Sequence, residues 1–168
     1  MTAPALLELA RAAAVETRVA EVVVIGAVAG LRGIDDLRGP ALTAQVAVDL
    51  DRHPVVLPYS SGTTGLPKGV VLSHRNLVVN VDQVQSMLEL TGADSTVAFL
   101  PFFHIYGLNV LMNPYLAAGA CIVTMPRFDL EAFLTHIQTH RPRHILVAPP
   151  VAIALAKHPM VDRFNLSS

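Results

Sequence analysis

A segment rich in glycine and hydroxyl side chains constrains the fold of this chain more than any other feature. It covers residues 59–69, reads YSSGTTGLPKG, and lies between two apolar runs at 55–57 and 70–72. Glycine allows a backbone to approach a ligand closely, and hydroxyl and N–H groups can donate hydrogen bonds. Lys68 adds a positive charge. The segment therefore favours a loop between two strands that binds a polyphosphate.

An ordinary turn is the alternative, because glycine, serine, threonine and proline also gather in turns between strands. The segment is not a Walker loop, in which a glycine precedes the lysine and Ser or Thr follows it. Here Pro67 precedes Lys68, and Gly69 follows it.

Apolar runs and helical patterns alternate along the rest of the chain. We expect helices to begin after two N-cap residues, Ser73 and Asp129, and to end at two glycines, Gly92 and Gly119. We also expect a kink at Pro114. Strands that alternate with helices indicate parallel βαβ units, so we predict an α/β fold with a layered parallel sheet. The predicted strands are 21–25, 55–59, 69–72, 96–100, 120–124 and 144–147, and the predicted helices are 5–18, 73–90, 106–118, 130–140 and 149–157.

Composition and charge exclude several classes of function. The formal net charge is −1, which gives no electrostatic reason to expect a nucleic acid or an acidic membrane surface as a partner. The apolar stretches at 22–31 and 116–125 contain glycine and fall short of the roughly 20 residues that span a bilayer. The single cysteine, Cys121, is expected to be an inert core residue and fits a reducing, cytoplasmic location.

Two motifs carry a family resemblance. Residues 60–69 (SSGTTGLPKG) resemble the phosphate-loop signature of the acyl-adenylate-forming (AMP-binding) superfamily, and residues 100–107 (LPFFHIYG) resemble its acyl-pocket motif. That superfamily includes acyl-CoA synthetases, 4-coumarate–CoA ligases and firefly luciferase. The resemblance is strong over 51–168, so this range is expected to be part of the AMP-binding domain. It is weak over 1–50, which is expected to be a helix–strand–linker segment of the same domain.

The resemblance implies a two-step reaction. A carboxylate attacks the α-phosphate of ATP, giving an acyl-adenylate and pyrophosphate, and coenzyme A then displaces AMP; Mg²⁺ accompanies the ATP. Lys68 would offset charge on the leaving group. The residues implied to hold the β- and γ-phosphates are Ser60, Ser61, Gly62, Thr63, Thr64, Gly65 and Lys68.

The second motif implies an acid-binding cavity. By the resemblance, His104 positions the carboxylate and gates the tunnel, although a lone histidine in apolar surroundings is also often a core residue. Tyr106 and Gly107 would line the cavity, whereas Phe102 and Phe103 are simpler to interpret as core residues. Hydroxycinnamate ligases lead us to expect a small polar residue near Val110. Its apolar side chain therefore favours an aliphatic or plain aromatic acid.

By the standard of this family, we expect the chain to be a central slice of a longer enzyme. The family pattern continues into an adenine-binding loop with a magnesium-binding glutamate, a ribose-binding aspartate and a C-terminal domain with a catalytic lysine. Without these parts, the 168 residues are expected to be inactive alone. The alternatives are a non-catalytic nucleotide-binding or phosphate-binding module, or a remnant that pairs with itself as a homodimer through exposed apolar surface.

Three histidines, His136, His140 and His144, are spaced by four, and the first two could ligate a metal from one helix. Pro142 breaks that helix before His144, so a solvated helix end is favoured over a zinc site, and no metal is predicted. Arg141 and Arg143 fit the C-terminus of that helix, where positive charge is favoured.

Overall fold

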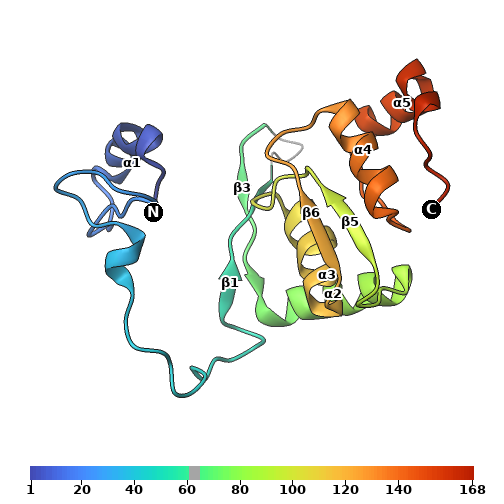
Figure 1. Ribbon diagram of the computed structural model, residues 1–168. Helices are drawn as coiled ribbons and strands as arrows, with labels where there is room; N and C mark the ends of the chain where they lie inside the picture. Colours follow the sequence, from blue (N-terminus) through green and yellow to red (C-terminus); the bar gives the residue numbers. More distant parts are fainter. Residues whose placement is uncertain (61–64) are drawn as a thin grey trace. The chain divides into compact units, whose positions relative to one another are not determined.

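The computed structural model describes residues 1–60 and 65–168 (Figure 1). Contacts between Cα atoms divide the chain into two compact units, Met1–Ala47 and Val48–Ser168.

The first unit contains short helices and extended segments. Its helices are η1 (Pro4–Leu6), α1 (Leu7–Ala14) and η2 (Ile34–Leu37). The strand predicted at 21–25 is wrong, because within this segment only Val24 pairs, through isolated parallel bridges to Thr2 and Gly33. Val24 is fully buried and anchors the unit. The helix predicted at 5–18 ends earlier, at Ala14, and Glu16 has a positive φ of 60°.

An antiparallel ribbon opens the second unit. Its strands are β1 (Pro54–Val56), β2 (Tyr59–Ser60), β3 (Lys68–Gly69) and β4 (Leu72–Ser73). β1 pairs with β4, β2 pairs with β3, and the amide of Val70 donates to the carbonyl of Pro58 at 2.9 Å between the two pairs. The strands predicted at 55–59 and 69–72 are therefore the two arms of one ribbon, each interrupted near its middle.

Helix α2 (His74–Leu88) begins where the ribbon ends. Ser73 caps it as predicted: its Oγ accepts a hydrogen bond from the amide of Asn76 at 3.4 Å, and Oδ1 of Asn76 accepts from the amide of Ser73 at 2.9 Å. The prediction that Gly92 ends this helix is wrong. Glu89 does so, in the left-handed conformation with φ of 50°.

A parallel βαβ unit follows and confirms the α/β class. β5 (Ser95–Ala98) pairs in parallel with β6 (Cys121–Thr124), and between them run the π-helix η3 (Tyr106–Met112) and α3 (Asn113–Ala118). η3 passes into α3 at Asn113, one residue before Pro114, and the kink expected at Pro114 stays a prediction. Gly119 ends α3 with φ of 72°, as predicted.

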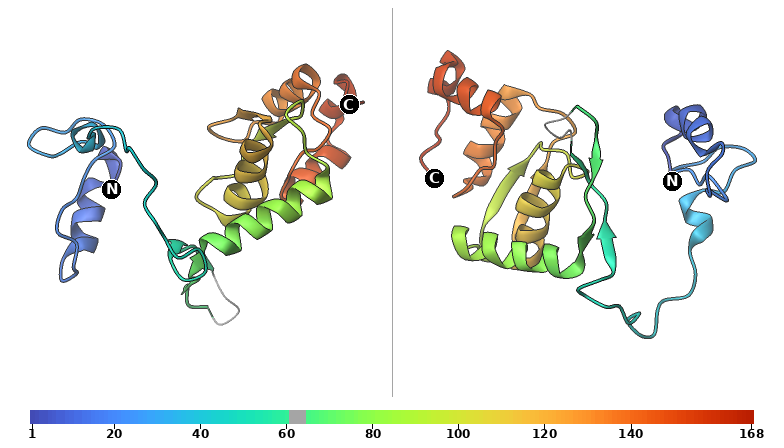
Figure 2. Two further views of the ribbon diagram at one scale, coloured as in Figure 1. Left: turned by 90° about the horizontal axis from the view of Figure 1, so that it is seen from below. Right: turned by 180° about the vertical axis from the view of Figure 1, so that it is seen from behind.

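Helices cover both faces of this small sheet (Figure 2). Asp129 caps α4 (Leu130–His140) as predicted, through a 2.9 Å hydrogen bond from the amide of Ala132, and α5 (Pro149–Lys157) and η4 (Pro159–Arg163) follow. Alternate residues of β5 face opposite sides, because Val97 packs with α4 while its neighbour Thr96 lies beside Tyr115 of α3. The main core cluster comprises Val97, Met125, Phe133, Ile137 and Val151.

Two further predictions fail in this unit. Residues 144–147 form no strand, although Ile145 and Val147 pack on the core. The contact from β5 is a side-chain hydrogen bond, in which the hydroxyl of Thr96 donates to the carbonyl of His144 at 3.4 Å, and not a backbone ladder. Cys121 is exposed, since it opens β6 at the rim of the sheet. No helix in the described parts of the chain has the length and apolar character needed to cross a bilayer.

Candidate functional site

The ribbon brings the two ends of the glycine-rich segment together. Ser60 on β2 lies directly opposite Lys68 on β3, and Tyr59 lies opposite Gly69. Gly65 has φ of +84°, which other residues adopt only with strain. Ser61, Gly62, Thr63 and Thr64 lie outside the described residues. The backbone thus places the predicted lysine beside the first predicted hydroxyl.

A cavity of about 380 Å³ joins this ribbon to the second sequence motif. His104 and Ile105 form one side of it, and Tyr59 and Ser60 form another; the full lining is Pro58, Tyr59, Ser60, Val70, Leu72, His104 and Ile105. Two predicted site residues from separate motifs, Ser60 and His104, therefore share one cavity.

His104 lies on a turn at the entrance to η3. Its amide donates to the carbonyl of Pro101 at 3.0 Å, and its Nδ1 accepts from the amide of Tyr106 at 3.2 Å. The residue is exposed, so it is not a buried core histidine. Phe103, on the same turn, is 89% exposed, and the expectation of a core residue there is wrong because the turn directs this ring outward. Phe102 is half-buried.

A second cavity, of about 370 Å³, adjoins the first, because Leu72 and Ile105 line both. Tyr106 and Val110 lie on its η3 side, one helical turn apart. Amide side chains contribute the polar part of its wall; the complete lining is Leu72, Asn76, Leu77, Asn80, Ile105, Tyr106, Asn109 and Val110.

The amides of this wall were missed by sequence reasoning. Asn109 is buried, and its Nδ2 donates to Oδ1 of Asn80 on α2 at 2.7 Å; its own Oδ1 accepts from Nδ2 of Asn113 at 3.0 Å. The first bond fastens η3 to α2, and the second connects α3 to η3. The available signal was the spacing of four between Asn76 and Asn80, and again between Asn109 and Asn113, which puts each pair on one helical face.

Gly107 is buried against backbone and is not among the residues that line either cavity. A Cβ built at this position would overlap the carbonyl of Pro101 and lie 3.1 Å from the carbonyl oxygen of Leu100. The structure therefore needs glycine at 107 so that η3 can begin tightly against the preceding segment. That contact fixes where Tyr106 and Val110 stand.

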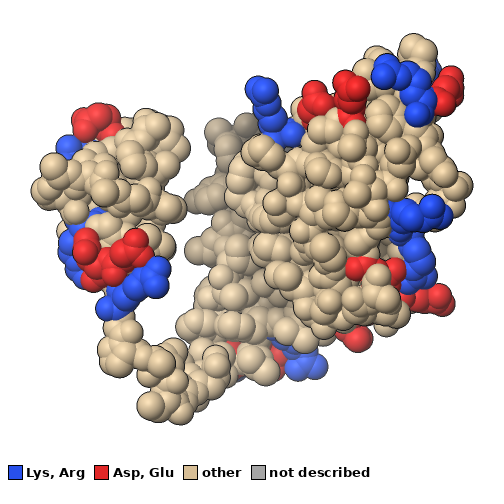
Figure 3. Space-filling view, in the orientation of Figure 1, with Lys and Arg blue, Asp and Glu red and all other residues tan. Residues whose placement is uncertain are grey.

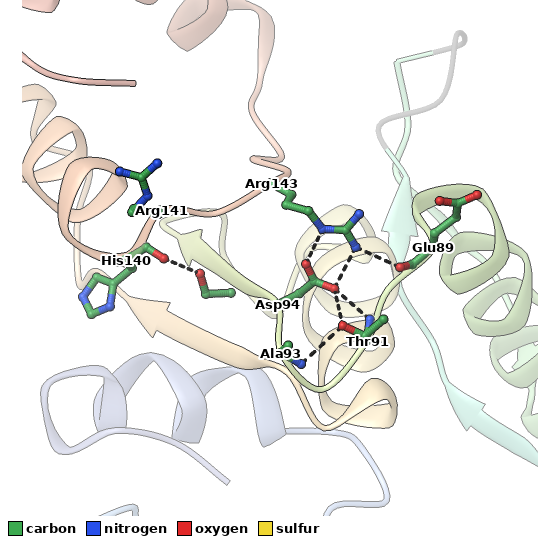
Figure 4. A pocket seen from close by; sticks show the side chains of 8 residues that line it. Glu89, Thr91, Ala93, Asp94, His140, Arg141 and Arg143 are labelled. Atoms are coloured by element: carbon green, nitrogen blue, oxygen red, sulfur yellow. Dashed lines mark hydrogen bonds and ion pairs between the residues drawn. The ribbon is translucent and has the colours of Figure 1, made fainter. Parts of the chain in front are cut away.

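A separate polar cavity of about 530 Å³ lies where α4 ends (Figure 4). Its central feature is an ion pair: Arg143 contacts Asp94 through Nε at 2.6 Å and Nη2 at 2.9 Å, and Nη2 also donates to the carbonyl of Glu89 at 2.9 Å. The amide and hydroxyl of Thr91 donate to the same carboxylate at 2.8 and 2.9 Å. The sequence predicts only that the positive charge of Arg143 fits the C-terminus of α4. In the structure Arg143 also connects the end of α4 to Asp94, directly before β5.

The ion pair makes a pH-dependent contribution to stability. Hydrogen bonding from Arg143, reinforced by Thr91, holds the pKa of the buried Asp94 carboxyl well below its ordinary value of 3.8. A carboxyl with a depressed folded-state pKa stabilises the fold above its unfolded-state pKa. That stabilisation is therefore complete at neutral pH and is lost as the pH falls below about 4.

We expect Asp94→Asn to lower the free energy of unfolding at pH 7 by about 1–3 kcal/mol, because charged hydrogen bonds become neutral ones around a buried group. Denaturant unfolding at pH 7 and pH 3 measures this, and the difference between the two proteins should shrink at pH 3. Asp35→Asn is the control, since Asp35 pairs with Arg38 at an exposed position. An equal effect of both substitutions would contradict the structural role of Asp94.

The histidines at the end of α4 show no metal-binding arrangement. The rings of His136 and His140 lie 5.8 Å apart between centroids. Within the described residues, no group of three His, Cys, Asp or Glu side chains is placed to hold a metal ion.

Charged side chains are sparse over much of the second unit. In the view of Figure 3 they lie mainly towards its edges and leave a broad uncharged middle. Exposed apolar residues are numerous in this unit, and include Leu57, Val71, Val78, Phe103 and Leu116.

Comparison with known proteins gives one family over nearly the whole chain. The family model described as "AMP-binding enzyme" matches residues 2–168. The chain is 45% identical over 128 residues to 4-coumarate–CoA ligase 2 of Oryza sativa subsp. japonica, covering 74% of this chain and 22% of that protein. It is 44% identical over 118 residues to 4-coumarate–CoA ligase 4 of Arabidopsis thaliana, covering 68% of this chain and 21% of that protein.

Solved structures show the same similarity. A red-emitting luciferase from Phrixothrix hirtus matches with a TM-score of 0.80 and 28% identity, over 99% of this chain and 34% of that one. The amide bond synthetase McbA from Marinactinospora thermotolerans matches with a TM-score of 0.77 and 25% identity, over 98% of this chain and 32% of that one. The chain thus spans less than a quarter of the two plant relatives and about a third of these two structural neighbours.

Proposed function

Because the chain belongs to the AMP-binding enzyme family, we propose that it supplies the triphosphate grip and part of the acid-binding wall of an ATP-dependent acid–CoA ligase. The proposed reaction of the whole enzyme joins a carboxylic acid to coenzyme A through an acyl-adenylate. We expect the 168 residues to lack this complete activity by themselves.

The observation that carries the proposal is the cavity shared by Ser60 and His104. An adenylating site must hold a triphosphate and a carboxylate so that the carboxylate oxygen faces the α-phosphate. Proximity and orientation supply much of the acceleration in such a displacement. In this chain the ribbon with Lys68 supports the phosphate side, and the adjoining cavities support the acid side.

Lys68 and the hydroxyls of residues 60–64 are proposed to bind the β- and γ-phosphates, with Gly65 allowing close approach of the backbone. Lys68 would stabilise the negative charge that develops on departing pyrophosphate. Magnesium is proposed as the ion that accompanies ATP. Coenzyme A is proposed as the acceptor in the whole enzyme.

The acid is proposed to extend from His104 along Tyr106 and Val110. An isopropyl group at 110 cannot hydrogen-bond a phenol, so an aliphatic or plain aromatic acid is favoured over a hydroxylated one. The 4-coumarate ligases to which the chain is similar are named for a hydroxylated acid, which makes Val110 the position at which to test selectivity.

The experiment is a binding panel. The chain is titrated with octanoate, cinnamate and 4-coumarate, and Val110→Ser is compared with the unsubstituted protein. We expect Val110→Ser to shift the ratio of affinities towards 4-coumarate by about three- to tenfold, the effect of one neutral hydrogen bond. Val78→Ser is the control, because Val78 is 65% exposed and lines neither acid cavity. The same shift in the control, or none at Val110, would contradict this assignment.

A cytoplasmic location is also proposed, because the single cysteine of this chain would stay reduced there. It also includes a homodimer, because exposed apolar side chains such as Leu57, Val71 and Leu116 favour self-association. Light scattering of the purified chain tests this, and a monomer across the accessible concentration range would count against it.

A further inference from the structure

The outward face of helix α2 carries both charged and apolar side chains. Arg75, Val78, Val79 and Asp82 lie on it together, because positions three, four and seven apart share one face of a helix. All four residues are exposed, Val78 to 65% and Val79 to 47%. None of them lines either cavity of the candidate site. A partner could therefore cover this face while ligand binding remains a separate property of the chain.

A groove of about 500 Å³ lies beside this face, between α2 and α3, which run side by side (Figure 2). Val78 and Asp82 line it from α2, and Leu116, which is 61% exposed, lines it from α3. Nε2 of Gln85 donates to the carbonyl of Pro114 at 3.0 Å and holds the two helices together. A largely apolar groove between two fixed helices is the kind of surface on which another helix packs.

The charges of this face are symmetric about its apolar centre. Arg75 lies three residues before Val78, and Asp82 lies three residues after Val79. If a second copy of α2 lay antiparallel to the first, with a twofold axis between positions 78 and 79, Arg75 of each copy would stand level with Asp82 of the other. A parallel arrangement would instead place like charges together, which is costly. The charge pattern therefore fits a second copy of this chain in one orientation.

Both charged groups have the capacity to make this contact. The side chain of Asp82 makes no hydrogen bond or ion pair with another described residue. Arg75 pairs with Asp51 at 3.1 Å, but both side chains are largely exposed, and such a pair stabilises little. A guanidinium also has five N–H donors, so Arg75 can keep Asp51 and still bond to Asp82 of a second copy.

We propose that two copies of this chain associate through α2, antiparallel, with Val78 and Val79 at the twofold axis and an ion pair between Arg75 and Asp82 on each side of it. The groove beside α3 would receive apolar side chains of the second α2. An interface that uses the same surface twice closes at the dimer. The inference rests on the homodimer included in the proposed function and names the surface that forms it.

The experiment reverses the two charges one at a time. Arg75→Asp makes both positions acidic and Asp82→Arg makes both basic, so an antiparallel pair of either variant brings like charges together. We expect the dissociation constant of each homodimer, measured by sedimentation equilibrium, to rise by at least about tenfold. Glu8→Arg is the control, because it reverses an exposed charge on α1, where Glu8 pairs with Arg11. The control should change the dissociation constant by less than about twofold.

An equimolar mixture of the two variants gives the sharpest readout. In a mixed pair, opposite charges meet again on both sides of the axis. We expect a heterodimer whose dissociation constant lies within about threefold of that of the unsubstituted chain, as for two restored surface ion pairs. The double variant Arg75→Asp/Asp82→Arg should recover self-association in the same way. Circular dichroism checks that each variant is folded, and if a single variant is not, the double variant decides the outcome.

Three results would overturn the proposal: an unsubstituted chain that stays monomeric across the accessible concentration range, single variants that dimerise as well as the unsubstituted chain, or a mixture that recovers no association. In the second case the chain dimerises through another face. Failure of the proposed function is seen separately, as the absence of Mg-ATP binding in calorimetry of the same samples, because the face of α2 lines neither cavity of the candidate site.

Discussion

Replacing Lys68 with alanine is expected to weaken the binding of Mg-ATP to this chain by about 10- to 100-fold. The expected loss corresponds to one hydrogen bond between charged groups, since each tenfold change is about 1.4 kcal/mol. Lys68 opens β3 opposite Ser60, where the glycine-rich segment returns to the ribbon. Calorimetric titration of both proteins with Mg-ATP measures the effect.

Arg75→Ala is the matched control for removing a positive charge. Arg75 lies on α2, its side chain is 68% exposed, and it pairs with Asp51 at 3.1 Å. Its loss should change the affinity for Mg-ATP by less than about twofold, because its charge is already paired with Asp51 at the surface and it lines neither cavity of the candidate site. If Arg75→Ala and Lys68→Ala weaken binding equally, the attraction is a general effect of charge and not a property of the loop.

Gly107→Ala should be the most damaging small substitution near the acid cavities. The new methyl group would overlap the carbonyl of Pro101, which is backbone and cannot move aside as a flexible side chain can. We expect the free energy of unfolding to fall by about 1–3 kcal/mol, the usual cost of overpacking a tight site. Displacement of η3 should also weaken the binding of octanoate, because Tyr106 and Val110 move with it.

Gly39→Ala gives the comparison for the glycine effect. No heavy atom lies within 4 Å of a Cβ built at Gly39, so alanine there should be neutral or slightly stabilising. Denaturant unfolding and octanoate titration of both variants measure the difference in stability and in affinity between them. Similar behaviour of the two proteins would show that the contact with Pro101 does not constrain the position of η3.

Local signals in the sequence predicted the helix boundaries that depend on neighbouring residues. Ser73 and Asp129 cap α2 and α4 because their side chains bond amides three residues away, and Gly119 ends α3 because its φ is positive. Such interactions are complete within one turn of chain, so composition and spacing are enough to identify them.

Features that require distant partners were beyond the same reasoning. A hydrophobic run such as 144–147 becomes a strand only if a neighbouring backbone pairs with it, and here Thr96 contacts it with a side chain. Arg143 and Asp94 lie 49 residues apart in sequence, and nothing near either one reveals the pair. The exposure of Phe103 and Cys121 likewise depends on what the rest of the fold leaves uncovered.

The candidate site combines both kinds of information. The family resemblance predicted that residues near 60–68 and 104–110 belong to one site, and the structure places Ser60 and His104 around one cavity and Tyr106 and Val110 around the adjoining one. The amides of Asn80 and Asn109 were not predicted, because only the packing of η3 on α2 brings them together. Their roles, lining the second cavity and joining η3 to α2, depend on contacts between residues that are distant in the sequence.

The most direct test of the account is a chemical-shift map of the ¹⁵N-labelled chain titrated with Mg-ATP. The account predicts saturable shifts at the amides of Lys68, Gly69 and His104, with no change around the polar cavity of Asp94 and Arg143. Shifts confined to that polar cavity, or a folded chain whose spectrum does not respond to millimolar Mg-ATP, would contradict the claim that the two motifs form one nucleotide and acid site.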